Sequence, residues 1–564
     1  MTSKNGFTRR NVCAPREMLV WGLGIAMVLG LTGACRNPEQ FKQSADKEAY
    51  GILTDKWQDD FGQQVNYEVR DQAPNDVDMA PLIPPSRVLD LAQAVNIATQ
   101  FSRSYQSQRE SLYLSALDLT RTRHQYKRQW FGTFDATYAA NNGDNDVSVG
   151  GAGGVNQNHL LGDGIQIGTG LAIDWARFLS GDPRTTLGSV LMASVSAPLL
   201  GNGAGKSARE NLTQAERNVL YRIRTFNRFR KTFVISILNS YYQVLQRRDT
   251  VRVREDSYRR QVDSTDQLIM EANVGQLKQS AADEARQDLL QAENSLISAR
   301  QNYQQSLDNF KIDLSLPTDA NITLDQNELP ALEAAGVYEP NYTEEEATEI
   351  ALERRLDLAN TRDGLDDVER KLILAAEGLG VQLNLVGSAN VGSTPATDVT
   401  RLRFHEGAYS IGIEGDLPLD RKAERNAYRE ALITVQQRQR NYDEEVDRVK
   451  LAMRQAFRDL SETAESYRIQ KEGVKLADNR VQEQKIRLKN GRGVIRELQN
   501  SEAALVQAQI SLTNALVSHT FAKLNFFRDI GLLQVRPDGM WEHVNYDISE
   551  GQANAQSIEF AQPQ

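Results

Sequence analysis

The hydrophobic and polar positions of this chain follow two different periods, in an order that occurs twice. Apolar residues recur at helical spacing over about 86–129, 206–270, 277–314, 342–377, 422–489 and 495–530. Between these runs, apolar residues alternate with polar or small ones over 165–176, 188–198, 381–391 and 409–417, as in a β-strand with two unlike faces. The sequence therefore predicts two repeats, each with a helix, strands, a very long helix and a return helix.

The number of strands in the first repeat stays open at this point. The aromatic segment 131–140 is a further candidate strand, and the Gly-, Asn- and Asp-rich stretch 141–164 is predicted to be a loop. The helices on both sides of each strand set lie at the same end of the strands, so each set must cross an even number of times. Either the weak segment Val147–Gly151 forms a fourth strand, or one of the three candidates does not cross.

Internal duplication is the strongest organisational feature. Four residues of the first return helix region align with four of the second at a constant offset of 216 residues: Gly275, Ala292, Leu296 and Phe310 with Gly491, Ala508, Leu512 and Phe526. The first repeat is longer by 33 residues, which we place between its strands, where loops tolerate growth. The predicted divisions are a first repeat at 86–317, a linker at 318–341 and a second repeat at 342–533.

The two ends of the chain carry other signals. Residues 1–34 join a basic start to the apolar run Met18–Ala34, which is typical of a secretory signal peptide. The segment Leu31–Cys35 resembles a bacterial lipobox and predicts cleavage before Cys35 and its lipidation; the alternative is a plain signal with an incidental cysteine. Residues 35–85, acidic and punctuated by proline, predict a lipid-anchored tether with little regular structure, and 534–564 a disordered tail.

The long helices and the strands do not suit a single globular chain. A helix of about 65 residues spans roughly 100 Å and needs partner helices along its whole length. Strands of about ten residues with one apolar and one polar face, following a secretory signal, are typical of an outer-membrane β-barrel, in which closure removes the sheet edges. Four or five strands cannot close a useful barrel, so several copies must share one.

This pattern resembles the TolC-like outer-membrane efflux protein family over about residues 86–533. The resemblance rests on Ala197–Gly201 and Leu417–Asp420 before the long helices, and on Gly275 and Gly491 before the return helices. It implies an α+β membrane protein, in which the duplicated repeat forms a long periplasmic α-helical barrel and a transmembrane β-barrel of 12 strands is shared by three protomers.

The resemblance also implies a function, partners and sites. The chain would be the passive outer-membrane exit duct of a tripartite efflux pump or type I secretion system, served by a periplasmic adaptor and an inner-membrane transporter. The family's acidic periplasmic gate corresponds to Glu497 and Asn500, one carboxylate where the family often has two; the alternative for Glu497 is an ordinary exposed helix charge. The hairpin tips that meet the adaptor correspond to Val274, Gly275, Gln276, Leu277, Gly491, Arg492, Gly493 and Val494.

Composition and motifs argue against several other functions. The net charge of −10 at pH 7 argues against nucleic acid as a partner. The five histidines are scattered without metal-ligand spacing, and the sequence offers no nucleophilic catalytic set, so we predict no cofactor, no metal and no enzyme activity. The basic stretch Arg222–Lys231 is predicted to be a solvated or interprotomer helix face.

The glycine-rich segment before the first long helix resembles a nucleotide-binding loop. Gly201–Ser207 is one residue short of a nucleotide-binding P-loop, because Leu200 stands where the first glycine belongs. Ser207 and Glu210 instead predict a capping box at the start of the long helix. The remaining functional alternative is a lipid-anchored periplasmic coiled-coil scaffold that does not span the membrane.

Overall fold

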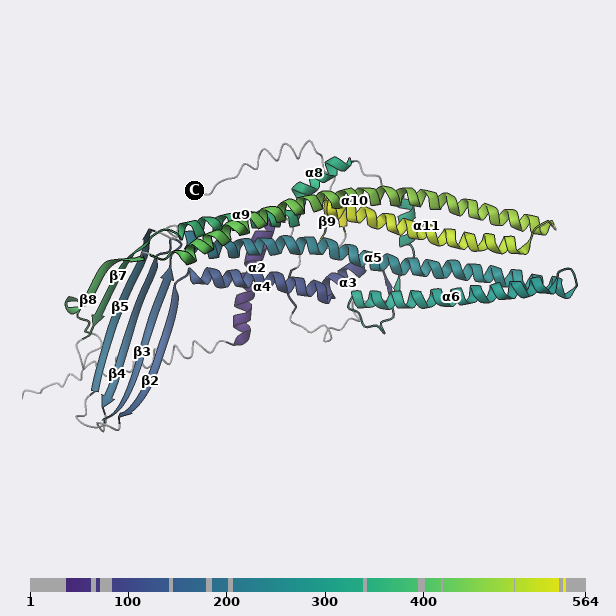
Figure 1. The fold of residues 1–564 in the computed structure, drawn as a ribbon. Helices are drawn as coiled ribbons and strands as arrows, with labels where there is room; N and C mark the ends of the chain where they lie inside the picture. The colour runs from purple at the N-terminus through teal and green to yellow at the C-terminus, as the bar shows by residue number, and fades with distance from the viewer. Residues whose placement is uncertain are drawn as a thin grey trace, which may run out of the picture.

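Two antiparallel helical hairpins extend away from a six-stranded sheet that lies at the other end of the molecule (Figure 1). This computed structural model describes residues 37–61, 67–70, 84–141, 146–178, 185–200, 206–337, 342–393, 401–416, 419–490, 492–536 and 541–543. The predicted signal peptide, the lipidation residue Cys35 and the tip residue Gly491 lie outside these ranges.

The four helices of the hairpins repeat each other in length and position. α5 (Lys206–Asn273) and α10 (Lys422–Lys489) have 68 residues each, and their return helices α6 (Gln279–Asp313) and α11 (Ile495–Asp529) have 35 each. Both pairs of helices begin 216 residues apart, so the predicted duplication is confirmed. At 1.5 Å per residue, each long helix spans about 100 Å. Its buried side chains recur at intervals of three and four residues, as in Val219, Ile223 and Phe226.

The helix that precedes the strands in each repeat is divided in two. In the first repeat, α3 (Leu91–Phe101) and α4 (Arg103–Gln125) meet at Ser102, which has extended backbone; the single helix predicted up to about residue 129 is therefore wrong. In the second repeat, α8 (Glu344–Arg354) and α9 (Leu356–Glu377) meet in the same way at Arg355. The predicted linker holds β6 (Thr323–Leu324), which pairs with β1 (Val88–Leu89), and a short helix α7 (Glu328–Ala335).

The sheet has six antiparallel strands in the order β2-β3-β4-β5-β7-β8. The first repeat supplies four of them and the second repeat two, with a short 3₁₀ helix (Phe404–Glu406) between the last two strands. Their bounds are β2 (Gln129–Asn141), β3 (Asp146–Leu160), β4 (Gln166–Phe178), β5 (Thr185–Leu200), β7 (Gln382–Gly392) and β8 (Ala408–Asp416). The loop predicted for 141–164 is wrong, because most of it is β3. Parity is satisfied by this fourth strand.

β3 is rich in glycine and has almost no alternating pattern of its own. One of its glycines lies between large residues of the two neighbouring strands: Gly153 is paired with Phe134 of β2 on one side and with Ile173 of β4 on the other. Large side chains beside a glycine supply the cross-strand contacts that the glycine lacks. The strand is thus specified mainly by its partners, which explains why its own sequence predicted a loop.

The two faces of the sheet differ in polarity. Residues paired across the strands share a face, so the register assigns each side chain. One face is apolar and carries Trp130, Phe134, Tyr138, Ile167, Leu171, Ile173, Leu191, Val195, Leu385, Val391, Tyr409, Ile411 and Ile413. The other face is mostly polar or small, with a few exceptions such as Met192, and carries Thr133, Asp135, Thr137, Asn156, Asn158, Gly168, Asp174, Ser194, Ser388, Asn390, Ser410 and Glu414.

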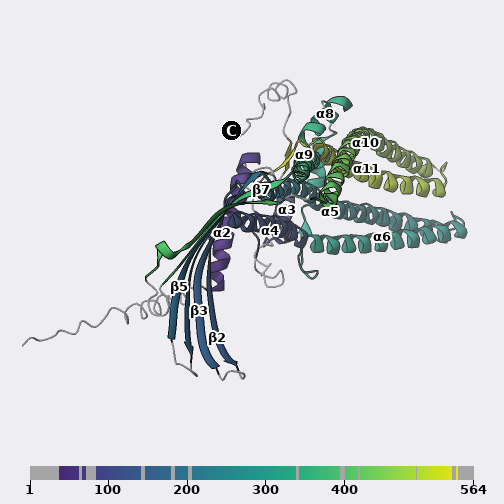
Figure 2. The same ribbon diagram turned by 60° about the vertical axis from the view of Figure 1, so that its left-hand side comes forward.

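The segment predicted to be an irregular tether contains a helix, α2 (Pro38–Phe61), so that prediction is wrong for these residues. α2 lies across α4 and α5 (Figures 1 and 2) and buries Ala49, Leu53 and Trp57 against them. Tyr113 of α4 donates a hydrogen bond to Asp46 at 2.6 Å. The apolar residues at 49, 53 and 57 have helical spacing and indicate this helix, although the prolines of the segment favour an irregular structure.

The predicted disordered tail also begins with order. β9 (Leu533–Val535) and β10 (Trp541–His543) form an antiparallel pair, which corrects the prediction for these positions. β9 is held against α5, where Arg230 Nη2 donates to the carbonyl of Val535 at 3.2 Å. Within the described ranges, no helix combines the length and the apolar character that crossing a lipid bilayer requires.

Candidate functional site: the helical tips and the sheet

The first hairpin tip is a glycine-terminated helix end. Gly275 has a φ of +80°, a conformation that favours glycine. Its N–H donates to the carbonyl of Ala272 at 3.0 Å, and the N–H of Gln276 donates to that of Glu271 at 2.9 Å. This is the Schellman pattern, which satisfies the last carbonyls of α5. The side chain of Val274 is 70% exposed, so the tip presents an apolar group to solvent.

The second tip is constrained at a different glycine. The N–H of Arg492 donates to the carbonyl of Arg487 at 3.0 Å. This bond spans five residues, as does the bond from Gln276 to Glu271 in the first tip. A Cβ added to Gly493 would lie 2.5 Å from the backbone nitrogen of Leu488, closer than real contacts allow. Val494 is the N-cap residue of α11, and its side chain is 58% exposed. The chain thus needs glycine at 493 so that it can pass the end of α10.

An ion pair joins the two hairpins just above these tips. Arg496, in the first turn of α11, donates through Nε to Glu284 Oε1 of α6 at 2.9 Å. Burial, followed by the nearby negative charge of Glu284, raises the pKa of Asp288 one turn further along α6. This contact could not be predicted from the pattern of either hairpin, because Arg496 and Glu284 are 212 residues apart in the sequence.

The predicted gate residues lie beside this ion pair. Glu497 is in the first turn of α11, and both Glu497 and Asn500 are exposed. In the described part of the chain, no group of three or more His, Cys, Asp or Glu side chains is arranged to hold a metal ion. A cation site built on Glu497 would therefore draw on further copies of the chain.

The polar face of the sheet is continuous along one line of hydrogen-bonded neighbours. This line crosses all six strands through Gln129, Asn158, Gly168, Ser194, Ser388 and Ser410. Ser388 and Ser410 lie 2.7 Å apart between their hydroxyl oxygens. A surface of hydroxyl and amide groups at this end can be wetted, while the opposite apolar face cannot.

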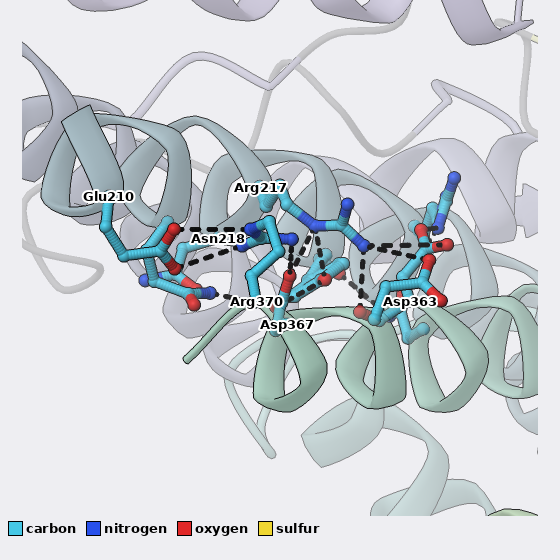
Figure 3. A network of polar contacts seen from close by, with 11 residues as sticks. Glu210, Arg217, Asn218, Asp363, Asp367 and Arg370 are labelled. Carbon is cyan, nitrogen blue, oxygen red and sulfur yellow. Dashed lines mark hydrogen bonds and ion pairs between the residues drawn. The ribbon is translucent and has the colours of Figure 1, made fainter. Parts of the chain in front are cut away.

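A partly buried polar network joins α5 of the first repeat to α9 of the second repeat (Figure 3). Asp367 of α9 pairs with Arg217 Nε of α5 at 2.6 Å and with Arg370 Nη1 at 2.9 Å. It also accepts hydrogen bonds from Tyr221 Oη at 2.7 Å and Gln214 Nε2 at 3.0 Å. The Asp367 side chain is 6% exposed, and its two oxygens divide these contacts: Oδ1 takes part in the ion pairs and Oδ2 accepts the hydrogen bonds.

Electrostatics agrees with that geometry. Burial acts to raise the pKa of Asp367, but the hydrogen bonds and the cations around it outweigh burial and hold the pKa below its usual value of 3.8. Burial, together with the carboxylate beside it, raises the pKa of Tyr221 to about 12. Glu210, predicted to form a capping box, accepts two hydrogen bonds from Arg370 at 3.2 Å. The network fastens the two repeats together.

The basic stretch Arg222–Lys231 was predicted to be a solvated or interprotomer helix face, but within one copy part of it is already buried. Arg230 is 6% exposed and lies over the Trp57 ring of α2, with 5.9 Å from its guanidinium carbon to the ring centre. Burial and the neighbouring arginines lower the pKa of Lys231 to about 8. Arg230 of this stretch therefore contacts both α2, through Trp57, and β9, through the carbonyl of Val535.

Comparison with known proteins rests on structure alone. No protein-family model matches the chain, and no curated protein matches its sequence. The fold superimposes on the solved structure of CusC, described as undergoing transmembrane channel formation, with a TM-score of 0.58 and 13% identity over 83% of this chain and 96% of that one. It also matches the CmeC outer membrane channel of Campylobacter jejuni with a TM-score of 0.56 and 13% identity, covering 82% and 88%. The chain has the fold of the TolC-like outer-membrane efflux channels.

This channel fold extends across most of the molecule. The VceC outer membrane protein of Vibrio cholerae matches with a TM-score of 0.56 and 15% identity, covering 78% of this chain and 96% of that one. The structures that it resembles are channels rather than enzymes. At this level of identity the likeness concerns the fold and does not extend to the roles of individual residues.

Proposed function

We propose that this protein is the outer-membrane exit duct of an efflux pump or type I secretion system. Three copies would close the sheets into a transmembrane β-barrel, and their helices would form a tube through the periplasm. The duct is passive, and an inner-membrane transporter supplies the energy. One observation carries the proposal: a sheet with one apolar and one polar face continues into helices of about 100 Å.

The polarity of the sheet matches a membrane barrel. All six strands have nine residues or more, and a tilted transmembrane strand needs about 9–11. The apolar face would meet lipid and the polar face would line the water-filled interior. Cys35 would be acylated and would anchor the chain beside the barrel. α2, which begins at Pro38, would then lie close to that anchor.

The hairpin tips would receive the periplasmic adaptor. The exposed side chains Val274 and Val494 provide small apolar contacts at the two tips, and Arg492 adds a charge. Glu497 and Asn500 would narrow the entrance, and three copies of Glu497 would gather negative potential there. The geometry of the tips supports this assignment, because both end in tight glycine-dependent turns that hold these side chains outward.

The test uses two adjacent residues on opposite faces of β5. Leu191 lies on the apolar face and Met192 on the polar face. Leu191→Arg should reduce insertion into the outer membrane, because an arginine facing lipid near mid-membrane costs about 2–4 kcal/mol. Met192→Arg should insert normally and change ion selectivity. Both are measured as outer-membrane yield and as single-channel conductance in planar bilayers.

The outcomes separate the channel from the alternative scaffold. A channel gives stepwise conductance from the unsubstituted protein and unequal responses of the two variants. A lipid-anchored scaffold that does not span the membrane would give no conductance and equal membrane yields for Leu191→Arg and Met192→Arg. That pair of results would overturn the proposal.

A further inference from the structure

The sheet has two open edges, formed by β2 and β8. β2 is 13 residues long, and its apolar face carries Trp130, Phe134 and Tyr138 at 66%, 68% and 69% exposure. Both views place β2 along one border of the sheet and β8 along the other (Figures 1 and 2). An edge of unpaired backbone groups is not tolerated in lipid, so in a membrane each edge must find a partner strand.

The two edges are complementary in direction. β2 leaves the helical end of the molecule after α4, whereas β8 returns toward that end before α10. Copies related by rotation about a pore axis would therefore present β2 and β8 to each other as antiparallel strands. Such a contact between unlike edges closes a ring when the rotation permits.

The stagger of the sheet suits this closure. Gln129 begins β2 at the helical end, and the line of paired residues through it reaches Ser410, six residues before β8 ends at Asp416. A shift of six residues over five strand steps, at about 3.3 Å per residue and about 4.8 Å per step, corresponds to a tilt of about 40°. Closed barrels have strand tilts of about 35–45°.

The duplication shows which strands are additional. β4 and β7 begin at residues 166 and 382, and β5 and β8 end at residues 200 and 416; both pairs differ by the same 216 that relates the long helices. β2 and β3 have no counterpart, because α9 is followed directly by β7. The extra residues of the first repeat thus lie before its matched strands, and not between them as the sequence suggested. They form a hairpin added to one edge of a four-stranded unit.

We propose that β2 of each copy pairs with β8 of the next, so that three copies close a barrel of 18 strands. This rests on the proposed function, which supplies the membrane and the number of copies. The 12-stranded barrel implied by the family resemblance would need four strands per copy, and this chain has six. Because barrel diameter grows roughly linearly with strand number, the pore through the membrane would be about 1.5 times as wide, in the range that leaves an aqueous channel.

Cysteine cross-linking in outer membranes tests the seam. Thr133→Cys or Thr137→Cys on β2 is combined in turn with Ser410→Cys, Gly412→Cys or Glu414→Cys on β8, all on the polar face. At least one of the six combinations should give disulfide-linked species of two and three chains on non-reducing gels, and none larger. Bands also present in the unsubstituted protein are not counted.

The matched control places both cysteines inside one copy. Ser388→Cys with Ser410→Cys joins neighbouring strands whose hydroxyl oxygens lie 2.7 Å apart, and it should cross-link without any increase in mass. If this control forms while all six seam combinations fail, the seam is wrong. A ladder that ends at two chains would mean a 12-stranded barrel and would overturn the number 18.

Pore width gives an independent readout. Polyethylene glycols of graded size are added on the barrel side of a planar bilayer, and the largest polymer that still lowers conductance is recorded. The limit should exceed by about half that of a deletion variant lacking residues 129–160, which keeps four strands per copy. Equal limits would overturn the proposal. Absence of conductance from the full chain would instead count against the proposed function itself.

Discussion

Arg496 of α11 and Glu284 of α6 form an ion pair that joins the two helical hairpins near their tips. The side chains are 68% and 42% exposed, so the contact is screened by solvent. Exposed pairs of this kind contribute about 0.2–1 kcal/mol. An ion pair of this strength would favour a closed arrangement of the proposed entrance and would still allow it to open.

Reversing one charge of this pair should therefore favour opening modestly. Arg496→Glu is expected to raise the open probability in planar bilayers by up to about fivefold, the equivalent of about 1 kcal/mol. The double variant Arg496→Glu/Glu284→Arg should restore the original value. Arg492→Glu, an exposed charge change at the same tip, serves as the control; an equal effect there would mean that net charge, and not the pair, controls opening.

The gate prediction concerns Glu497 and its neighbour one turn along. Glu497→Gln should weaken block of the channel by divalent cations added from the helical side, because it removes the one carboxylate per copy at this position. Asn500→Asp should strengthen block by doubling the carboxylates. Single-channel recordings at graded Mg²⁺ concentration measure both. If cation block is unchanged in both variants, Glu497 is an ordinary exposed helix charge with no role at the entrance.

The two tip glycines are required for different reasons, and substitution of either should reduce export. Gly275→Val forces a β-branched residue into positive φ, at a cost of roughly 1–2 kcal/mol, and should reduce export while trimers persist. Gly493→Ala already brings a Cβ against the backbone of Leu488 and should reduce export as well. Gly473→Ala, an open position within α10, is the control. If both tip variants export normally, the proposal that the adaptor contacts these turns is wrong.

Asp367 should control acid stability. Its pKa is lowered in the folded protein, so its contribution is present above the unfolded value of about 3.8 and is lost as pH falls through the lower folded value. Asp367→Asn leaves Arg217 and Arg370 without their buried partner and should cost about 3–5 kcal/mol at pH 7. It should also flatten the loss of stability below pH 4.

Thermal unfolding followed by helical circular dichroism between pH 3 and 7 measures both effects. Asp366→Asn is the matched control, because that carboxylate is 56% exposed and lies 3.6 Å from the same Arg217. Similar losses of stability in the two variants would show that the burial of Asp367 does not set the size of the effect.

The sequence by itself determined the elements that repeat and that carry their own period. The 68-residue helices, their return helices and the strands β4, β5, β7 and β8 are each readable from local spacing, and the offset of 216 places them twice. The tip glycine Gly275 was likewise readable, because positive φ is a property of one residue and its neighbours.

Tertiary structure decided the features that depend on distant partners. β3 is a strand because β2 and β4 pair with it on both sides, with Phe134 and Ile173 beside Gly153. α2 is packed against α5 because Arg230 and Phe226 contact Trp57. The pairing of Arg496 with Glu284 likewise joins residues far apart in the chain. Local periodicity carries no information about such pairs, since each depends on which surfaces the folded chain brings together. The six-stranded sheet, and with it the proposed width of the pore, belongs to this second group.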